Sequence, residues 1–175
     1  MDHHKVPGIE NSTGSLGHGL GFAVGCALSA RMLGKSYRSF CLLSDGELYE
    51  GSIWEAILCA SAYRLGRLVA IIDRNRLTMD GFTEDLVPLE PLEDKFRAFG
   101  FHVLRVDGHD MDALCEALDK ASQGEDRAAP SVVIADTVKG KGVSFMENQA
   151  RWHYGALDSD MYEQALESLS RVYGG

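Results

Sequence analysis

Short, nearly uninterrupted apolar runs alternate with helical patterns along this chain, and the alternation limits the folds open to it. Strands that are buried on both faces of a parallel sheet carry such continuous runs, whereas strands with one wet face alternate apolar and polar residues. Helices between consecutive parallel strands form right-handed crossovers that cover the sheet. The pattern therefore predicts an α/β fold, an open parallel sheet with helices on both faces. The expected strands are residues 39–43, 67–72, 101–106 and 131–135.

Apolar residues at helical spacing fill the intervals between these strands. Asp110 is a good N-cap for one of the helices, and Asp158 or Ser159 for the last one. The connection 75–91 is long for a compact domain, and such loops often carry function. The expected helices are residues 16–33, 52–65, 92–99, 111–121 and a last helix that ends near residue 169.

Length, charge and cysteine spacing narrow the class of protein. The 175 residues are expected to form one domain, and the net charge of −9 argues against nucleic acid as the main partner. No apolar stretch approaches the roughly 20 residues that cross a membrane, and residues 1–5 do not begin a signal peptide, so we expect a cytoplasmic protein. The cysteines have no zinc spacing, which favours reduced thiols. They are Cys26, Cys41, Cys59 and Cys115.

Polar side chains follow the first two predicted strands where each strand ends. Asp45 and Gly46 come directly after the first strand, and Asn75 follows the second, thirty positions beyond Asp45. If these strands are neighbours, both side chains lie at the carboxyl edge of the sheet, where open α/β sheets bind ligands. Carboxylate and amide oxygens suit Mg²⁺, which usually takes one or two protein groups together with phosphate oxygens.

Two further features fit a site for a metal-bound phosphate. The backbone carbonyl of Leu77 offers a third oxygen, and Gly46, which has no Cβ, would let a phosphate approach its N–H closely. The helix that follows would present its N-terminus, which favours anions. An Asp-Gly pair after a strand is also typical of an ordinary turn, so the residues alone leave both interpretations open.

Several motifs make the chain similar to the transketolase family. The segment SDGE at 44–47, followed by DRNRL at 73–77, resembles the thiamine diphosphate fingerprint, GDG followed about thirty residues later by N. PGIENSTGSLGHG at 7–19 resembles the family's PGIExSTGSLGQG, and DGELYEGSIWEA at 45–56 its DGExxEGxxWEA. Residues 107–110, 137–143 and 152–153 also match in family order. The match extends from about Val6 to Ala165 and is closest to N-terminal subunits of transketolases that are split over two chains.

The resemblance implies the thiamine diphosphate-binding fold, in its diphosphate-binding module, and a role for each matching residue. Asp45, Asn75 and the Leu77 carbonyl would hold Mg²⁺, or Ca²⁺ or Mn²⁺ in its place, against the diphosphate of thiamine diphosphate. Gly46 and Glu47 would lie at the diphosphate.

Outside the two strand ends, the resemblance points to the glycine-rich segment and to one histidine. Gly14 and Leu16 would line the cofactor, with Leu16 near the aminopyrimidine. His153 matches a family histidine that contacts the diphosphate and the reacting region, which would make it both a cofactor-binding and a catalytic residue. A surface histidine in a loop is the alternative for His153.

The implied reaction transfers a two-carbon ketol unit from a ketose to an aldose, with sugars or sugar phosphates as substrates. In this family a glutamate of a separate pyrimidine-binding domain activates the cofactor. We therefore expect a companion subunit that carries the pyrimidine-binding and C-terminal domains, in a heterotetramer of two plus two chains. Residues 1–175 would be a single domain without the family's N-terminal segment.

Two departures from the family pattern bear on the site. Ser44 replaces the first Gly of GDG. Arg74 precedes Asn75, where many relatives carry Asn or Asp, and its positive charge would either assist the diphosphate or be solvated. The alternative functions are another thiamine diphosphate carboligase, of the 1-deoxyxylulose-phosphate synthase type or from secondary metabolism, and a non-catalytic scaffolding subunit.

Overall fold

A four-stranded parallel sheet forms the centre of the computed structural model, which describes residues 5–123 and 129–174. The strand order is β1-β2-β4-β3, so the last strand in the sequence lies between two earlier ones. All neighbours are parallel, with Ser44 of β1 opposite Asp73 of β2. This confirms the predicted α/β class. The strands are β1 (Ser39–Ser44), β2 (Leu68–Arg74), β3 (His102–Asp107) and β4 (Ser131–Asp136).

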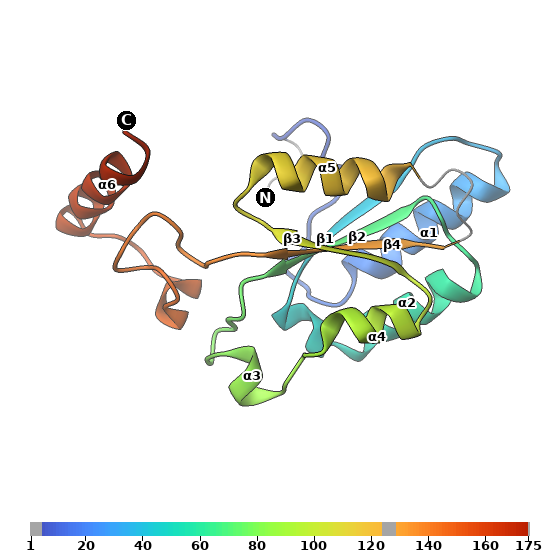
Figure 1. Cartoon of the computed structure of the whole chain (residues 1–175), viewed down its shortest axis with the longest axis horizontal. Coiled ribbons are helices and arrows are strands. Elements are labelled where there is room, and N and C mark those ends of the chain that lie inside the picture. Colours follow the sequence, from blue (N-terminus) through green and yellow to red (C-terminus); the bar gives the residue numbers. More distant parts are fainter. Residues whose placement is uncertain (1–4, 124–128, 175) are drawn as a thin grey trace.

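Helices cover both faces of the sheet (Figure 1). On one face lie α1 (Gly19–Met32), α2 (Gly51–Ala62) and α4 (Leu92–Ala98), and on the other lies α5 (Met111–Ser122). The Asp110 carboxylate accepts a hydrogen bond from the Ala113 N–H at 3.0 Å, which confirms the predicted cap of α5.

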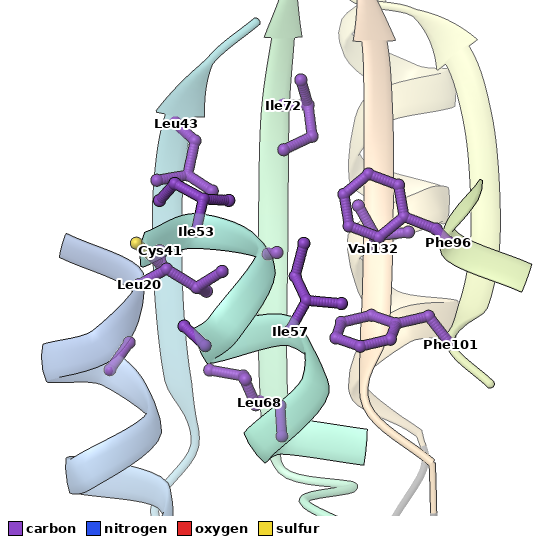
Figure 2. Close-up of a cluster of buried hydrophobic side chains, with 14 of the residues drawn as sticks. Leu20, Cys41, Leu43, Ile53, Ile57, Leu68, Ile72, Phe96, Phe101 and Val132 are labelled. Carbon is purple, nitrogen blue, oxygen red and sulfur yellow. The ribbon is translucent and has the colours of Figure 1, made fainter. Parts of the chain in front are cut away.

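The larger hydrophobic core fills the space between the sheet and the three helices of the first face. Figure 2 shows Ile53 and Ile57 of α2 lying over β1 and β2, with Phe96 and Phe101 beside Val132 of β4. The rings of Phe96 and Phe101 meet edge to face, with centroids 5.6 Å apart. Such close packing fixes the positions of the strand ends that carry the polar residues.

Strand β1 is covered on one face only. Cys41 and Leu43 belong to the main core, whereas Phe40 and Leu42 point to the opposite face and are 52% and 67% exposed. The helix α5 packs against β3 and β4 on that side, so its cover does not extend to β1.

The chain beyond β4 runs away from the sheet. It passes through the short 3₁₀ helix η2 (Ala150–His153) and ends in α6 (Ser159–Tyr173), which Figure 1 shows well separated from the sheet. Ala165 is the buried residue of α6, and the Asp158 carboxylate caps this helix through the Met161 N–H at 2.8 Å.

The observed elements differ from the predicted ones mainly at their ends. The first helix begins at Gly19 rather than at residue 16, because Gly17 has a φ of 86°, which is outside the helical region. The long connection 75–91 contains one helical turn, α3 (Thr83–Leu86). Within the described residues, no helix is long and apolar enough to cross a membrane.

Candidate functional site

The carboxyl ends of β1 and β2 bring Asp45 and Asn75 to the same edge of the sheet. The parallel register places Ser44 beside Asp73, and the Asp45 N–H donates to the Asp73 carbonyl at 3.1 Å. Asp45 and Asn75 therefore lie at similar positions along the sheet, just beyond the ends of their strands. The juxtaposition predicted from the order of the strands is confirmed.

The Asp45 carboxylate is fully buried and accepts three hydrogen bonds. The Gly46 N–H donates to Oδ1 at 2.8 Å, whereas Arg74 Nη1 at 2.9 Å and the Arg76 N–H at 2.6 Å both donate to Oδ2. Burial raises the pKa of Asp45, and the hydrogen bonds from these donors oppose that shift. Because each carboxylate oxygen accepts about two hydrogen bonds, Oδ2 is fully used and Oδ1 keeps one acceptor position.

Backbone strain at Arg76 directs one of these donors. Its φ of 65° lies in the left-handed region, which non-glycine residues rarely adopt. The strained turn aims the Arg76 N–H at Asp45 and lets the chain wrap around the carboxylate.

The amide of Asn75 has a defined orientation. Its Nδ2 donates to Asp73 Oδ2 at 3.0 Å, and its Oδ1 accepts from the Leu77 N–H at 3.0 Å. A carboxylate can only accept, so the nitrogen of the amide must face Asp73. Asn75 Oδ1 keeps one further acceptor position.

The Leu77 carbonyl is also available. Leu77 forms an isolated antiparallel bridge with Phe82, but the bridge uses the N–H and carbonyl groups of the adjacent residues. Among the described residues, no hydrogen bond to this carbonyl is found. Three oxygens with a spare acceptor position therefore follow the adjacent ends of β1 and β2: Asp45 Oδ1 after β1, and Asn75 Oδ1 and the Leu77 carbonyl after β2.

This donor set fits a hard divalent cation. One carboxylate, one amide oxygen and one carbonyl leave the remaining positions to phosphate oxygens and water, as Mg²⁺ prefers. The part of the chain that the structure describes holds no cluster of three or more His, Cys, Asp and Glu residues that could bind a metal by itself. Because three protein oxygens do not complete an octahedral shell, the set suits a metal that also binds an anionic ligand.

Gly46 lies against Thr78, in the segment that follows β2. A Cβ at this position would be 3.1 Å from Cγ2 of Thr78, so a side chain would push the two segments apart. The Gly46 N–H donates to Asp45, which differs from the expected N–H free for a phosphate. The 3₁₀ helix η1 (Gly46–Tyr49) follows directly, and α2 begins only at Gly51.

Glu47 connects this turn to the glycine-rich segment. It is 7% exposed, and its Oε1 accepts from the Gly17 N–H at 2.9 Å. Ser44 supports the turn, because its Oγ accepts from the Glu47 N–H at 3.1 Å. Gly14 and Leu16 lie in the exposed part of the glycine-rich segment.

Arg74 is neither solvated nor directed at a phosphate site. Its side chain is 0% exposed and donates to Asp45, so the solvated alternative is wrong. Nη2 donates to Glu84 at 2.7 Å and to Glu90 at 3.2 Å, both in the connection 75–91. Nη1 also donates to Thr83 Oγ1 at 2.8 Å. This cluster was not predicted from the sequence, where a basic residue at a buried strand end and two glutamates in the next loop were its only signals.

A second arginine extends the network along the sheet edge. Arg105 of β3 donates to both oxygens of Asp136, at 2.7 and 2.8 Å, and to Glu90 at 3.3 Å. The pKa of Glu90 falls to about 2, since hydrogen bonds and nearby arginines outweigh the opposing effect of burial.

An open cavity of about 550 Å³ lies over the ends of β2, β3 and β4. Asn75 and Arg76 form one wall, whereas Asp45 lies beneath the surface. His109 holds another wall in place, because its Nε2 accepts from the Val138 N–H at 2.8 Å. The lining residues are Asn75, Arg76, Phe82, Asp107, His109, Asp136, Thr137, Val138, Lys141 and Asn148.

His153 lies in η2 and is exposed. It does not line the cavity, and no contact in the described parts of the chain joins it to Asp45 or Asn75. Its neighbour Trp152 packs on Phe145, with ring centroids 5.5 Å apart. The expected catalytic role of His153 therefore stays a prediction.

The chain is similar to known proteins over nearly its whole length. The family profile described as "Transketolase, thiamine diphosphate binding domain" matches residues 2–171. An apulose-4-phosphate transketolase subunit from Phocaeicola vulgatus is 43% identical over 166 residues, which are 95% of this chain and 58% of that protein. The 6-deoxy-6-sulfo-D-fructose transketolase subunit SqwG from a Clostridium species is 41% identical over 170 residues, 97% of this chain and 61% of that protein.

The fold is also found among solved structures. The crystal structure of transketolase from Campylobacter jejuni matches 93% of this chain with a TM-score of 0.84 and 30% sequence identity, over 26% of its own length. The chain thus spans about three fifths of the two subunits and about a quarter of this longer enzyme.

Proposed function

The chain belongs to the transketolase family through its thiamine diphosphate-binding domain, and from this premise we propose that it binds thiamine diphosphate and Mg²⁺ as one half of a transketolase active site. The companion half would lie on another subunit that carries the pyrimidine-binding and C-terminal domains, in an assembly of two plus two chains. The reaction would be transfer of a two-carbon ketol unit from a ketose to an aldose.

One observation carries this proposal: three oxygens with a spare acceptor position follow the adjacent carboxyl ends of β1 and β2, and the Arg76 N–H bonds directly to Asp45 across these ends. Asp45 and Asn75 are each held in one orientation by hydrogen bonds, and the Leu77 carbonyl has no partner among the described residues. These oxygens would hold Mg²⁺ against the diphosphate.

The chemistry divides between cofactor and protein. Bound thiamine diphosphate supplies a centre that stabilises a carbanion, and the protein supplies position and electrostatics. In this chain, Glu47 ties the glycine-rich segment to the turn, so that Gly14 and Leu16 would line the cofactor. His153 would approach the reacting region from η2. Glu47 and Glu50 would lie on the diphosphate side, so we do not propose that either glutamate activates the pyrimidine.

Binding is tested by thermal unfolding with Mg²⁺ and thiamine diphosphate, added separately and together. A ligand at about 100 times its Kd stabilises the folded state by about 2.7 kcal/mol. We expect stabilisation by the pair together and much less in the Asp45→Asn variant. If the wild-type chain shows no shift, alone or with its companion subunit, cofactor binding is disproved and a scaffolding role is favoured.

The split site is tested by a ketol-transfer assay. We expect no turnover with this chain alone and turnover after the companion subunit is added. Full activity of this chain by itself would contradict the proposal. A screen of ketose donors and aldose acceptors with the assembled complex separates transketolase activity from that of other carboligases.

A further inference from the structure

We propose that Arg74 is a positioning residue that restricts Asp45 to binding a divalent cation through Oδ1 alone, which favours Mg²⁺ over Ca²⁺. The inference rests on the proposed function, because it requires Asp45 to be a metal ligand. It goes further by assigning a determinant of metal selectivity to a residue outside the ligand set.

The two oxygens of the Asp45 carboxylate are occupied to different extents. Oδ2 accepts from Arg74 Nη1 and from the Arg76 N–H, at 2.9 and 2.6 Å, and these two bonds use its acceptor capacity. Within residues 5–123 and 129–174, Oδ1 accepts one hydrogen bond, from the Gly46 N–H at 2.8 Å. A cation therefore meets one free acceptor position on this carboxylate, on Oδ1.

Arg74 cannot easily release Asp45 Oδ2. All five of its N–H donors are used: Nε on Glu90, Nη1 on Asp45 and Thr83, and Nη2 on Glu84 and Glu90. The side chain is 0% exposed, so water does not replace any of these acceptors. A planar guanidinium with five fixed donors can fill this position, whereas a lysine ammonium, with three donors, cannot.

Binding through one carboxylate oxygen affects which divalent metal is preferred. Mg²⁺ requires near-octahedral geometry at about 2.0–2.1 Å, which single carboxylate oxygens provide. Ca²⁺ is larger, takes six to eight oxygens and readily accepts both oxygens of one carboxylate. A carboxylate whose second oxygen is permanently used by Arg74 therefore favours the smaller ion.

The test is the ratio of the Mg²⁺ and Ca²⁺ affinities, measured by calorimetric titration of the full chain with saturating thiamine diphosphate, together with the companion subunit if binding requires it. Both ions carry the same charge, so a general change in local charge or stability moves both affinities and leaves the ratio nearly constant. We expect Arg74→Lys to lower the preference for Mg²⁺ about tenfold, because the single ammonium cannot hold Oδ2 and all the other acceptors.

Arg105→Lys is the matched control, since Arg105 shares Glu90 with Arg74 but does not touch Asp45. Its ratio should stay within about twofold of the wild-type value. An unchanged ratio in Arg74→Lys, or an equal fall in Arg105→Lys, overturns the inference while cofactor binding by the wild type stands. A wild-type chain that binds neither ion overturns the proposed function and the inference with it.

A second variant covers the case in which Arg74→Lys does not fold. Thr83→Val preserves the shape of a buried side chain but removes the hydroxyl that accepts from Nη1. We expect this looser guanidinium to lower the Mg²⁺ preference about threefold. If Arg74→Lys does not fold and Thr83→Val has the wild-type ratio, the inference is wrong.

Discussion

Two glycines of the segment before α1 differ in what surrounds them. Gly17 has a φ of 86°, and a Cβ built on it would lie 2.6 Å from Ser52 Oγ and 2.9 Å from Glu50 Cβ. Its N–H and its carbonyl are both bonded, to Glu47 and to Ser52. Gly14 has ordinary backbone angles and open space around the same position.

Gly17→Ala should therefore destabilise the protein by about 2 kcal/mol or more, through both backbone strain and a forced shift of Ser52. Gly14→Ala is the control and should change the free energy of unfolding by less than about 0.5 kcal/mol. Urea unfolding of the two variants measures the difference. Equal stabilities would mean that the segment is not held against α2 as described.

At the same scale, the candidate site divides into residues that the sequence predicts and one that it does not. Asp45 and Asn75 were predictable because parallel strands of known order bring their carboxyl ends to one edge. Arg74 was not, because its direction depends on Glu84 and Glu90, which reach it only through the course of the following loop. Sequence spacing predicts where a residue lies along its strand, but it does not predict which loop residues will contact that residue.

At the scale of elements, ion pairs hold the connection 75–91 in place together with the buried side chains of Leu77 and Leu89. Glu84 and Glu90 bind Arg74, and Glu90 also binds Arg105 of β3. Most ion pairs at a protein surface contribute little, but the two pairs with Arg74 share a fully buried guanidinium. The loop is thereby attached to two strands, and with it the Asn75 end of the site.

This attachment should weaken in acid. The pKa of Glu90 is lowered from 4.5 to about 2 in the folded protein, so the unfolded chain takes up the proton first as the pH falls. The stabilisation is present above pH 4.5 and is lost as the pH falls towards 2. Because Glu90 is one third exposed, solvent screening reduces the expected contribution to about 1 kcal/mol.

The Glu90→Gln variant should accordingly lose less stability than the wild type between about pH 5 and pH 2. Chemical unfolding followed by circular dichroism over this pH range measures the two slopes. Glu167→Gln, which alters an exposed pair on α6, should retain the wild-type slope. A Glu90→Gln slope equal to that of the wild type would show that Glu90 does not hold the loop.

The elements themselves were largely predictable. Continuous apolar runs marked all four strands to within two residues at either end, because strands buried on both faces require them. The start of α1 was placed too early, since apolar composition does not reveal the left-handed turn at Gly17. The η1 turn was missed for a similar reason, because four residues are too few to show a helical period.

At the scale of the whole molecule, the two faces of the sheet are covered unequally. Leu42 and Leu43 are adjacent in β1, yet one is 67% exposed and the other 2% exposed. Exposed apolar residues on an edge strand are uncommon in a monomer, because such edges tend to associate. In the isolated chain, we therefore expect substitutions on the two faces of β1 to change the free energy of unfolding by different amounts.

Leu43→Ala should cost about 2–5 kcal/mol, since it leaves a cavity in the main core. Leu42→Ala, its matched control on the opposite face, should cost less than about 0.5 kcal/mol in the isolated chain. Thermal or urea unfolding of both variants measures the effect. A large loss in Leu42→Ala would mean that its face is covered in solution.

The position of β4 has a consequence for how the protein is made. β1 and β2 are joined early in the sequence, and β3 follows, but β2 and β3 make no ladder with each other and meet only through β4. During synthesis, the ends of β1 and β2 that carry Asp45 and Asn75 can come together in the first βαβ unit, before the sheet is complete. The cavity beside it, walled by Asp107 and Thr137, has to wait until residue 136 leaves the ribosome and β4 inserts between its neighbours. The proposed metal-binding oxygens would then be positioned early in folding, whereas the cavity for the metal's ligand would form late.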